Sequence, residues 1–376
     1  MFFQVTAKDT ASLARCGLLQ TRHGSVLTPA FMPVGTQASV KSVEPGDLQD
    51  LGYRLILANA YHLFLRPGHR TIARLGGLHR FMGWEGALLT DSGGFQVHSL
   101  AEMRKIREEG VEFASHLDGT RHLLTPELSA EVQRDLGSDM VMPLDDCPPY
   151  PSDRQRLEEA VRRTTRWARR SLSFPLGEGQ RRFGIVQGGV YADLRGRSAG
   201  EIVAMGFDGY ALGGIGVGEP PELAVSAARE TVPIFPPASP RYVMGIGVPG
   251  QMLDLIAEGI DLFDCVLPTR NARNGTLFTS LGKINIKRKE YREDPGPIDP
   301  DCPCAACRQF SRAYLRHLYV SGEILASRLN TLHNLTYFAS VMARVRQAIR
   351  WGSFAGFRRS AEFLADAGVP PPDHTD

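Results

Sequence analysis

The segment LFDCVLPTRNARNG, residues 262–275, begins as a short apolar run and turns polar at its end. Seven earlier runs behave in the same way and close on glycine or a polar residue: residues 30–34, 55–59, 87–91, 140–145, 183–187, 210–214 and 242–246. Eight such runs separated by stretches with helical spacing are typical of a (β/α)8 barrel of the TIM type, an α/β fold. A doubly wound sheet would show the same alternation, and the count of eight favours the barrel.

Helical spacing is clear in four stretches with proline or an acid in the first turn: residues 125–136, 192–205, 221–231 and 249–258. Residues 111–123, with Asp118-Gly119 between alternating residues, predict a hairpin inserted after the third strand. A longer insertion follows the eighth strand and precedes a final helix near residues 335–351. We therefore expect three parts: a barrel core (1–282), a zinc-binding subdomain (283–334), and a C-terminal helix that completes the barrel, with a frayed tail (335–376).

The composition is that of an ordinary soluble protein. The chain has 376 residues, of which 43 % are apolar, enough for a full core. It shows no signal pattern and no apolar run near 18 residues, and its scattered cysteines suit a reducing compartment, so we expect a cytoplasmic protein without membrane contact. Arginines crowd residues 154–170 and lysines and arginines crowd residues 283–292; both segments suit phosphate binding, although the first is equally a solvated helix face paired with Glu158 and Glu159.

Cysteines are concentrated in DCPCAAC, residues 301–307, which holds three of the six in the chain. Together with a downstream histidine they predict a closed, tetrahedral and therefore structural site for one zinc ion per chain, with the ligands Cys302, Cys304, Cys307 and His333. The alternative is that the three cysteines lie close together by chance and bind no metal. His317 competes with His333, but it lies in an apolar, arginine-rich run and is better interpreted as a helix-face residue.

Acidic residues at the strand ends are the candidate reactive groups. Asp264 follows an apolar run and precedes Arg270 and Arg273, whose charges would favour an ionised nucleophile. A loop cap or a salt bridge is the structural alternative for this aspartate. Asp91 opens DSGGFQ, where two glycines allow close approach of a ligand and Phe95 offers a face for stacking.

Further candidates lie at the ends of the fourth, fifth and sixth strands. Of the adjacent acids Asp145 and Asp146, one can accept from the Watson–Crick edge of a guanine-like base, and its neighbour should then point away; we favour Asp145 for the base. Gln187, and the glycines of residues 213–218, would clasp a planar ligand. Glycine-rich strand ends could instead bind phosphate.

Taken together, six motifs in this order resemble bacterial tRNA-guanine transglycosylase over essentially the whole chain: DSGGFQ (91–96), DDCPPYP (145–151), VQGG (186–189), LGGIGVGE (212–219), FDCVLPTRNARNG (263–275), and CPCAAC (302–307) with His333. The resemblance implies a homodimeric, zinc-containing barrel enzyme. Such an enzyme exchanges guanine at the wobble position of a tRNA anticodon for 7-aminomethyl-7-deazaguanine, a queuosine precursor, without a redox or nucleotide cofactor.

The resemblance also assigns roles to residues. It implies that Asp264 is the nucleophile and Asp91 the general acid/base. It implies that the base is held by Ser92, Phe95, Asp145, Gln187, Gly213, Gly214, Ile215, Glu219 and Met244. The tRNA contacts that it suggests are Arg270, Arg273, Lys287 and Arg288.

Some positions depart from the commonest pattern of this family. Asp146 replaces the usual Glu, and Ile215-Gly216 stands where Leu-Ala or Leu-Ser is more familiar, whereas Cys147 and Val217 resemble the bacterial form. Two other classes of function stay open on the sequence: a barrel hydrolase that acts on free small molecules, and a non-catalytic zinc-containing protein that only binds tRNA.

Overall fold

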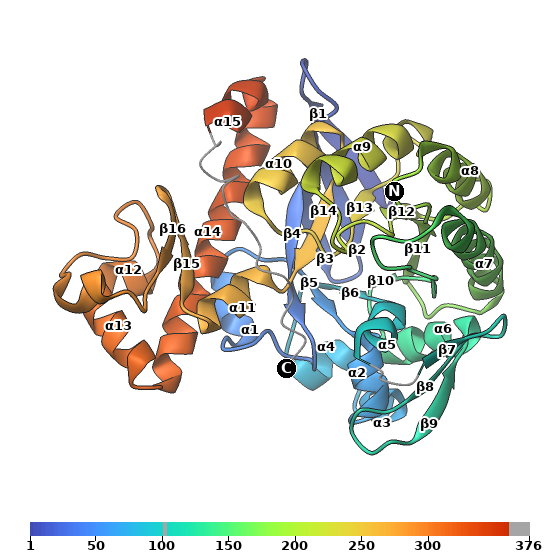
Figure 1. The fold of residues 1–376 in the computed structure, drawn as a ribbon, viewed down its shortest axis with the longest axis horizontal. Helices are drawn as coiled ribbons and strands as arrows, with labels where there is room; N and C mark the ends of the chain where they lie inside the picture. The colour runs from blue at the N-terminus through green and yellow to red at the C-terminus, as the bar shows by residue number, and fades with distance from the viewer. Residues whose placement is uncertain (101–103, 361–376) are drawn as a thin grey trace.

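A closed barrel of eight parallel strands forms the centre of the computed structural model, which describes residues 1–100 and 104–360 (Figure 1). The strands are β4 (Ala30–Gly35), β5 (Leu55–Ala58), β6 (Ala87–Thr90), β10 (Met140–Val141), β11 (Arg181–Val186), β12 (Gly209–Leu212), β13 (Arg241–Val243) and β14 (Leu262–Cys265). The last strand pairs with the first, Leu262 opposite Ala30, and closes the sheet. All eight predicted strands are confirmed, and the doubly wound alternative is excluded.

Alternation along the strands separates two apolar clusters. One side of each strand packs inside the barrel, as Met32, Leu57 and Leu89 do. The other side packs outward against helices, as Ile56 and Leu88 do. Since both faces are buried, the strands read as continuous apolar runs and not as alternating ones.

Helices cover the barrel, and the four stretches predicted as helical are confirmed as α6 (Pro126–Leu136), α8 (Ala192–Val203), α9 (Pro221–Thr231) and α10 (Pro249–Ala257). Thr125 caps α6 by accepting from the Leu128 amide, as a residue before Pro-Glu favours. The other helices before the eighth strand are α1 (Pro45–Asp50), α2 (Ala60–Leu65), α3 (His69–Arg74), α4 (Gly77–Met82), α5 (Gly94–Leu100), α7 (Arg154–Ser173) and the 3-10 turn η1 (Val232–Ile234).

Two three-stranded antiparallel sheets lie outside the barrel. The predicted hairpin is confirmed as β8 (Val111–Ala114) and β9 (Arg121–Leu124), and a third strand that the sequence did not indicate, β7 (Arg104–Ile106), pairs with β8. The second sheet, of β1 (Phe3–Lys8), β2 (Arg15–Thr21) and β3 (Gly24–Thr28), was also not anticipated. Its residues Phe3, Leu19 and Val26 join the interior cluster and cover one end of the barrel.

The segment after β14 contains α11 (Leu267–Arg273), the hairpin β15 (Thr276–Thr279) and β16 (Gly282–Asn285), η2 (Lys289–Glu293), α12 (Ala305–Gln309) and α13 (Arg312–Val320). In Figure 1 the part from β15 to α13, in orange, lies beside the barrel beyond α14 (Ile324–Arg350). It has an apolar cluster of its own that includes Leu277, Ile286 and Leu315.

The final helix was predicted near residues 335–351, but α14 begins earlier, at Ile324, and α15 (Phe354–Ser360) follows it. The expected division between residues 334 and 335 therefore falls inside one continuous helix. The boundaries of the three parts stay a prediction, and the tail after residue 360 lies outside the described residues. None of the described helices is long and apolar enough to span a membrane.

A buried carboxylate joins three elements where β10 begins. Asp139 Oδ1 lies 2.8 Å from His23 Nδ1, and Asp139 Oδ2 lies 3.3 Å from His79 Nε2 and accepts from the Leu88 amide. The two imidazoles stack with ring centroids 3.5 Å apart. Burial alone would raise the pKa of Asp139, but hydrogen bonds from His79, His23 and Leu88 outweigh it, so the pKa is lowered. Burial lowers the pKa of His79. The native state therefore holds an ionised Asp139 and a neutral His79.

We expect Asp139→Asn to lower the free energy of unfolding at neutral pH by about 1–3 kcal/mol, because a buried charge-assisted acceptor is lost. Lowering the pH should also decrease the free energy of unfolding of the wild type. Neutral His79 contributes fully above its ordinary pKa of 6.5 and progressively less below it, and ionised Asp139 is lost only when pH falls through its own lowered pKa. Urea unfolding at several pH values measures both effects, with exposed Asp193→Asn as the control. Equal losses for the two variants would contradict a role for this cluster.

Candidate active site and metal centre

Three aspartates gather where the barrel strands end, two of them buried and Asp91 partly exposed. Asp91 follows β6, Asp145 lies beyond β10, and Asp264 is the penultimate residue of β14. Asp145 is 8 % and Asp264 9 % exposed. The charge of Asp264 contributes to raising the pKa of Asp91, and the charge of Asp91 contributes to raising that of Asp145. The three carboxylates therefore share one electrostatic environment.

Asp91 is held by neutral donors. Its Oδ1 accepts from the Ala60 amide at 2.8 Å, and its Oδ2 accepts from the Asn59 side chain. Burial raises its pKa to about 6, although both hydrogen bonds oppose the shift. Such a group is mostly ionised at neutral pH, yet it can take up a proton with little driving force, as a general acid/base requires.

Asp264 is also held by neutral donors. Its Oδ1 accepts from the Tyr242 hydroxyl at 2.6 Å and from the Gly245 amide at 2.8 Å. Burial raises its pKa above the ordinary value, and these two hydrogen bonds act against burial. The sequence pointed to Arg270 and Arg273 as the groups that favour ionisation and missed Tyr242. The only signal for Tyr242 was a tyrosine within an otherwise apolar strand.

Asp145 faces Gln187, whose side-chain amide donates to Asp145 Oδ2 at 2.7 Å. Burial raises the pKa of Asp145 to about 7. Gln187 is fully buried, and its Oε1 has no hydrogen-bond partner among the residues that the structure describes. A Cβ atom at Gly214 would lie 2.4 Å from that Oε1, so only glycine leaves space there. A free acceptor beside a carboxylate is suited to a ligand that donates along one edge.

Asp146 points away from this pair, as the sequence analysis expected of the second acid. Arg156 and Arg163 of α7 both donate to its carboxylate. Other arginines of the crowded stretch also meet acids, Arg166 with Glu108 and Arg170 with Glu127. The arginine-rich segment is therefore largely an ion-paired helix face.

A buried guanidinium ties the ends of β11 and β12 together. Arg195, which is fully buried on α8, donates from Nε to the Gly189 carbonyl and from Nη2 to the Gly213 carbonyl, each at 2.7 Å. These bonds fix Gln187 relative to Gly213 and Gly214. Sequence reasoning missed Arg195, because one arginine among several on a helix gives no sign of its direction.

The loop after β12 is braced by a carboxylate. Glu219 accepts from the Gly216 amide and, at 3.0 Å, from the Val217 amide. Ile215 in the same loop is buried. A Cβ atom at Gly216 would lie 3.1 Å from the Met244 carbonyl, so the loops after β12 and β13 are in contact.

The remaining predicted residues divide into two regions. Ser92 is buried beside Asp91, and its carbonyl accepts from Ser129 of α6, whereas Phe95 on α5 is 50 % exposed. Arg270 and Arg273 lie on α11, immediately after Asp264. Lys287 and Arg288, by contrast, follow β16 on the segment that carries the cysteines, where Lys287 lies 5.2 Å from the centre of the Tyr319 ring.

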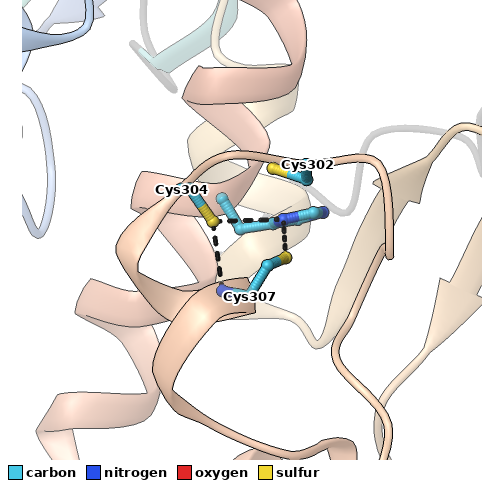
Figure 2. A group of neighbouring side chains, drawn as sticks. Cys302, Cys304 and Cys307 are labelled. Carbon is cyan, nitrogen blue, oxygen red and sulfur yellow. Dashed lines mark hydrogen bonds between the residues drawn. The ribbon is translucent and has the colours of Figure 1, made fainter.

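The cysteine segment and α14 bring four possible metal ligands together. The ligand atoms of Cys302, Cys304, Cys307 and His333 all lie within 4.8 Å of one another. Figure 2 shows the three cysteines gathered around one point, and His333 Nδ1 lies 3.2 Å from Cys307 Sγ and 3.7 Å from Cys304 Sγ. His317 is exposed on α13 and takes no part, as expected.

This donor set fits a tetrahedral zinc ion. Zn–S and Zn–N bonds of about 2.3 and 2.0 Å place sulfur and nitrogen about 3.6 Å apart at the tetrahedral angle. The other ring nitrogen, His333 Nε2, lies 2.7 Å from the Phe278 carbonyl, which leaves Nδ1 as the ligand atom. Four protein ligands leave no coordination position for a reacting water, so such a site would be structural.

Comparisons with known proteins agree with this geometry. The family model described as queuine tRNA-ribosyltransferase matches residues 9–365. A protein of that name from Solidesulfovibrio magneticus is 59 % identical over 94 % of this chain and 96 % of its own length. One from Oleidesulfovibrio alaskensis is 54 % identical over 98 % and 99 %. The chain belongs to the queuine tRNA-ribosyltransferase family.

Membership in this family makes the chain an enzyme of the pentosyltransferase class. The resemblance noted in the sequence is thereby confirmed. The residue assignments are a separate matter, because neither the family match nor the relatives assign a role to any side chain; they enter the proposal below.

We expect the purified queuine tRNA-ribosyltransferase family member to contain about one metal ion per chain, and Cys304→Ser to abolish it. Loss of one ligand should unfold the segment from β15 to α13, because a closed site contributes folding free energy directly. Metal analysis by mass spectrometry, combined with hydrogen exchange over this segment, tests both points. Cys16→Ser, a buried cysteine outside the cluster, is the control. A metal-free protein with normal protection of the segment would overturn the assignment.

Proposed function

We propose that the protein exchanges the guanine at the wobble position of a tRNA anticodon for 7-aminomethyl-7-deazaguanine, through a covalent link between the ribose and Asp264. The observation that carries the proposal is the arrangement of Asp264 and Asp91 in one barrel mouth beside the Asp145–Gln187 pair. The family match supports a pentosyltransferase that acts on tRNA.

Replacement of one base by another on the same face of the ribose requires two inversions, which a covalent intermediate supplies. Asp264 attacks C1′ and the bond from C1′ to N9 of guanine breaks. The leaving guanine takes a proton from the protonated form of Asp91, which a pKa of about 6 keeps accessible near neutral pH. The incoming base then loses its N9 proton to Asp91, N9 attacks C1′, and the bond to Asp264 breaks. Atoms and charges balance without a redox cofactor.

Recognition of the base rests on Asp145 and Gln187. The ionised Asp145 carboxylate accepts from the N1–H and the exocyclic amine of guanine, the donors that line its Watson–Crick edge. The two acceptors, Asp145 and Gln187 Oε1, suit a base with adjacent donors. A wobble base lies in a loop, so it can leave its stack and enter a pocket at modest cost.

The proposal also covers the metal, the contacts with tRNA, the walls of the base pocket and the assembly of the enzyme. The cysteine–histidine cluster would hold one structural zinc ion, and Arg270, Arg273, Lys287 and Arg288 would contact tRNA phosphates. Ser92, Phe95, Ile215 and Met244 would complete the walls around the base. A homodimer in the cytoplasm is our expectation for the assembled enzyme.

Two other functions make different predictions. A hydrolase acting on free small molecules would release a base without incorporating one, and a non-catalytic tRNA-binding protein would do neither. Incubation with labelled guanine and a tRNA that carries an unmodified wobble guanine separates the three. Only the exchange reaction places label in RNA. Absence of label in RNA with correctly folded protein would overturn the proposal.

We expect Asp264→Asn to reduce exchange by several orders of magnitude, because the amide keeps the shape and removes the attacking charge. Binding of tRNA should be nearly unchanged. Denaturing gels with labelled tRNA should show a covalent adduct in the wild type and none in the variant. An adduct that persists in Asp264→Asn would identify a different nucleophile, for which Asp91 is the nearest candidate.

We expect Glu219→Gln to weaken binding of 7-aminomethyl-7-deazaguanine more than binding of guanine, by about 1–3 kcal/mol. Glu219 holds the Gly216 amide, and in a planar trans peptide the Ile215 carbonyl then points the opposite way, where it can accept from the aminomethyl group. Guanine lacks this amine. Competition between the two bases measures the difference, and equal losses would mean that Glu219 only supports the loop.

A further inference from the structure

The two acids beyond β10 face opposite sides of the chain. Asp145 meets Gln187 in the barrel mouth, and Asp146 meets α7 on the outer side. Only 1 % of the Asp146 side chain is exposed. Arg156 donates from both terminal nitrogens, at 2.8 Å from Nη1 to Oδ2, and Arg163 donates to the same oxygen.

The main chain at this point is fixed as well. The Asp146 amide donates to Thr164 Oγ1 at 3.0 Å, and Thr164 is fully buried on α7. Side chain and backbone of one residue are therefore both bound to a single helix. That helix is capped at its start, where Asp153 accepts from the Arg156 amide. Because Asp145 and Asp146 are adjacent in the chain and meet partners on opposite sides of it, anchoring Asp146 to α7 limits the directions open to Asp145.

The same residues control charge near Asp145. Burial is the largest cause of the raised pKa of Asp145, the Gln187 hydrogen bond lowers this pKa, and the charges of Asp146 and Asp91 raise it further. Burial raises the pKa of the neighbouring Cys147 thiol to about 12, so that thiol is neutral. Arg156 and Arg163 offset the charge of Asp146, and Glu159 acts on Arg156 in turn. Asp145 must be ionised to accept two hydrogen bonds from a guanine-like edge. The balance between Asp146 and its arginines therefore bears on base recognition.

We propose that Asp146, clamped by Arg156 and Arg163, is a positioning residue that aims the Asp145 carboxylate at the base and sets the pH range over which it binds. The inference rests on the proposed function, since it assigns Asp145 to the base. It assigns a role to an ion cluster whose described partners for Asp146 all lie on α7.

Charge changes on the two sides of this cluster should shift base binding in opposite directions. Asp146→Asn removes a negative charge beside Asp145, so Asp145 should stay ionised to lower pH. The pH below which base binding is lost, its acidic limit, should therefore fall by about one pH unit. Arg163→Gln leaves Asp146 less compensated, so the limit should move up by a similar amount. The measurement is the Kd of 7-aminomethyl-7-deazaguanine by calorimetry from about pH 5 to about pH 9, a range that lies on both sides of the Asp145 pKa of about 7.

Orientation is tested by a second pair of variants. Asp146→Ala removes the anchor and should raise the Kd at the optimal pH about 10-fold, roughly the loss of one well-made hydrogen bond, with a smaller change in kcat. Asp146→Glu keeps the charge and should restore most of the affinity. Glu158→Gln, on the exposed pair with Arg154 of the same helix, is the matched control and should change neither quantity.

Each outcome decides a distinct point. A lower thermal stability of Asp146→Asn and Arg163→Gln, with no change in the Kd or in the pH below which binding is lost, would overturn the inference. That outcome would show that the ion cluster only stabilises the fold. Shifts of the same sign would overturn the charge argument. If Asp146→Asn does not fold, Arg163→Gln and Asp146→Glu still test the sign and the rescue. Base binding by the wild type without exchange into tRNA would overturn the proposed function alone, and no base binding would overturn both.

Discussion

Desolvation of three carboxylates at the strand ends is the constraint on which the site depends. Each acid loses hydration and is compensated by neutral donors: Asp91 by Asn59 and Ala60, Asp264 by Tyr242 and Gly245, and Asp145 by Gln187. Direct pairing with a cation would hold a carboxylate well below its ordinary pKa and make it a poor proton acceptor. Loss of hydration raises the pKa of Asp91 to about 6 and that of Asp145 to about 7 against the effect of these neutral donors, so both acids can exchange protons near neutral pH.

These donors exist only because the barrel is closed. Tyr242 reaches Asp264 from the neighbouring strand, and Arg195 reaches two carbonyls at the ends of β11 and β12 from the helix between them. Arg195 has a pKa lowered to about 10 by burial, and its described hydrogen bonds go to carbonyl groups. A cation held by backbone dipoles keeps the glycine-rich strand ends in place without neutralising the acids that react. Packing of the helices outside the barrel thus determines distances inside its mouth.

The barrel and the metal ligands could be predicted from sequence because each depends on short-range pattern. Strands buried on both faces leave apolar runs with polar ends, and DCPCAAC fixes three ligands by spacing. What was missed depends on contacts between distant segments. The residues of β1, FQVTAK, alternate between apolar and polar over six positions only, and Phe3 is buried because the barrel interior receives it. The role of Tyr242 depends on β13 lying beside β14. The start of α14 was predicted too late, because packing against α12 and α13 extends that helix beyond its apolar stretch.

The long helix α14 links the cysteine–histidine cluster to the segment that follows Asp264. His333 would contribute a ligand atom from this helix, and the adjacent Asn334 donates to the Pro268 carbonyl at 2.9 Å and to the Thr276 carbonyl at 3.1 Å. Pro268 opens the helix α11 that directly follows Asp264 and Cys265 in the chain. Asn330, one turn earlier, lies 3.3 Å from the Ala272 carbonyl of the same helix. A metal bound at this cluster would order a helix whose residue Asn334 fixes the main chain beyond Asp264, the proposed nucleophile. A metal with no open coordination position would then act on the proposed reaction through the position of α11.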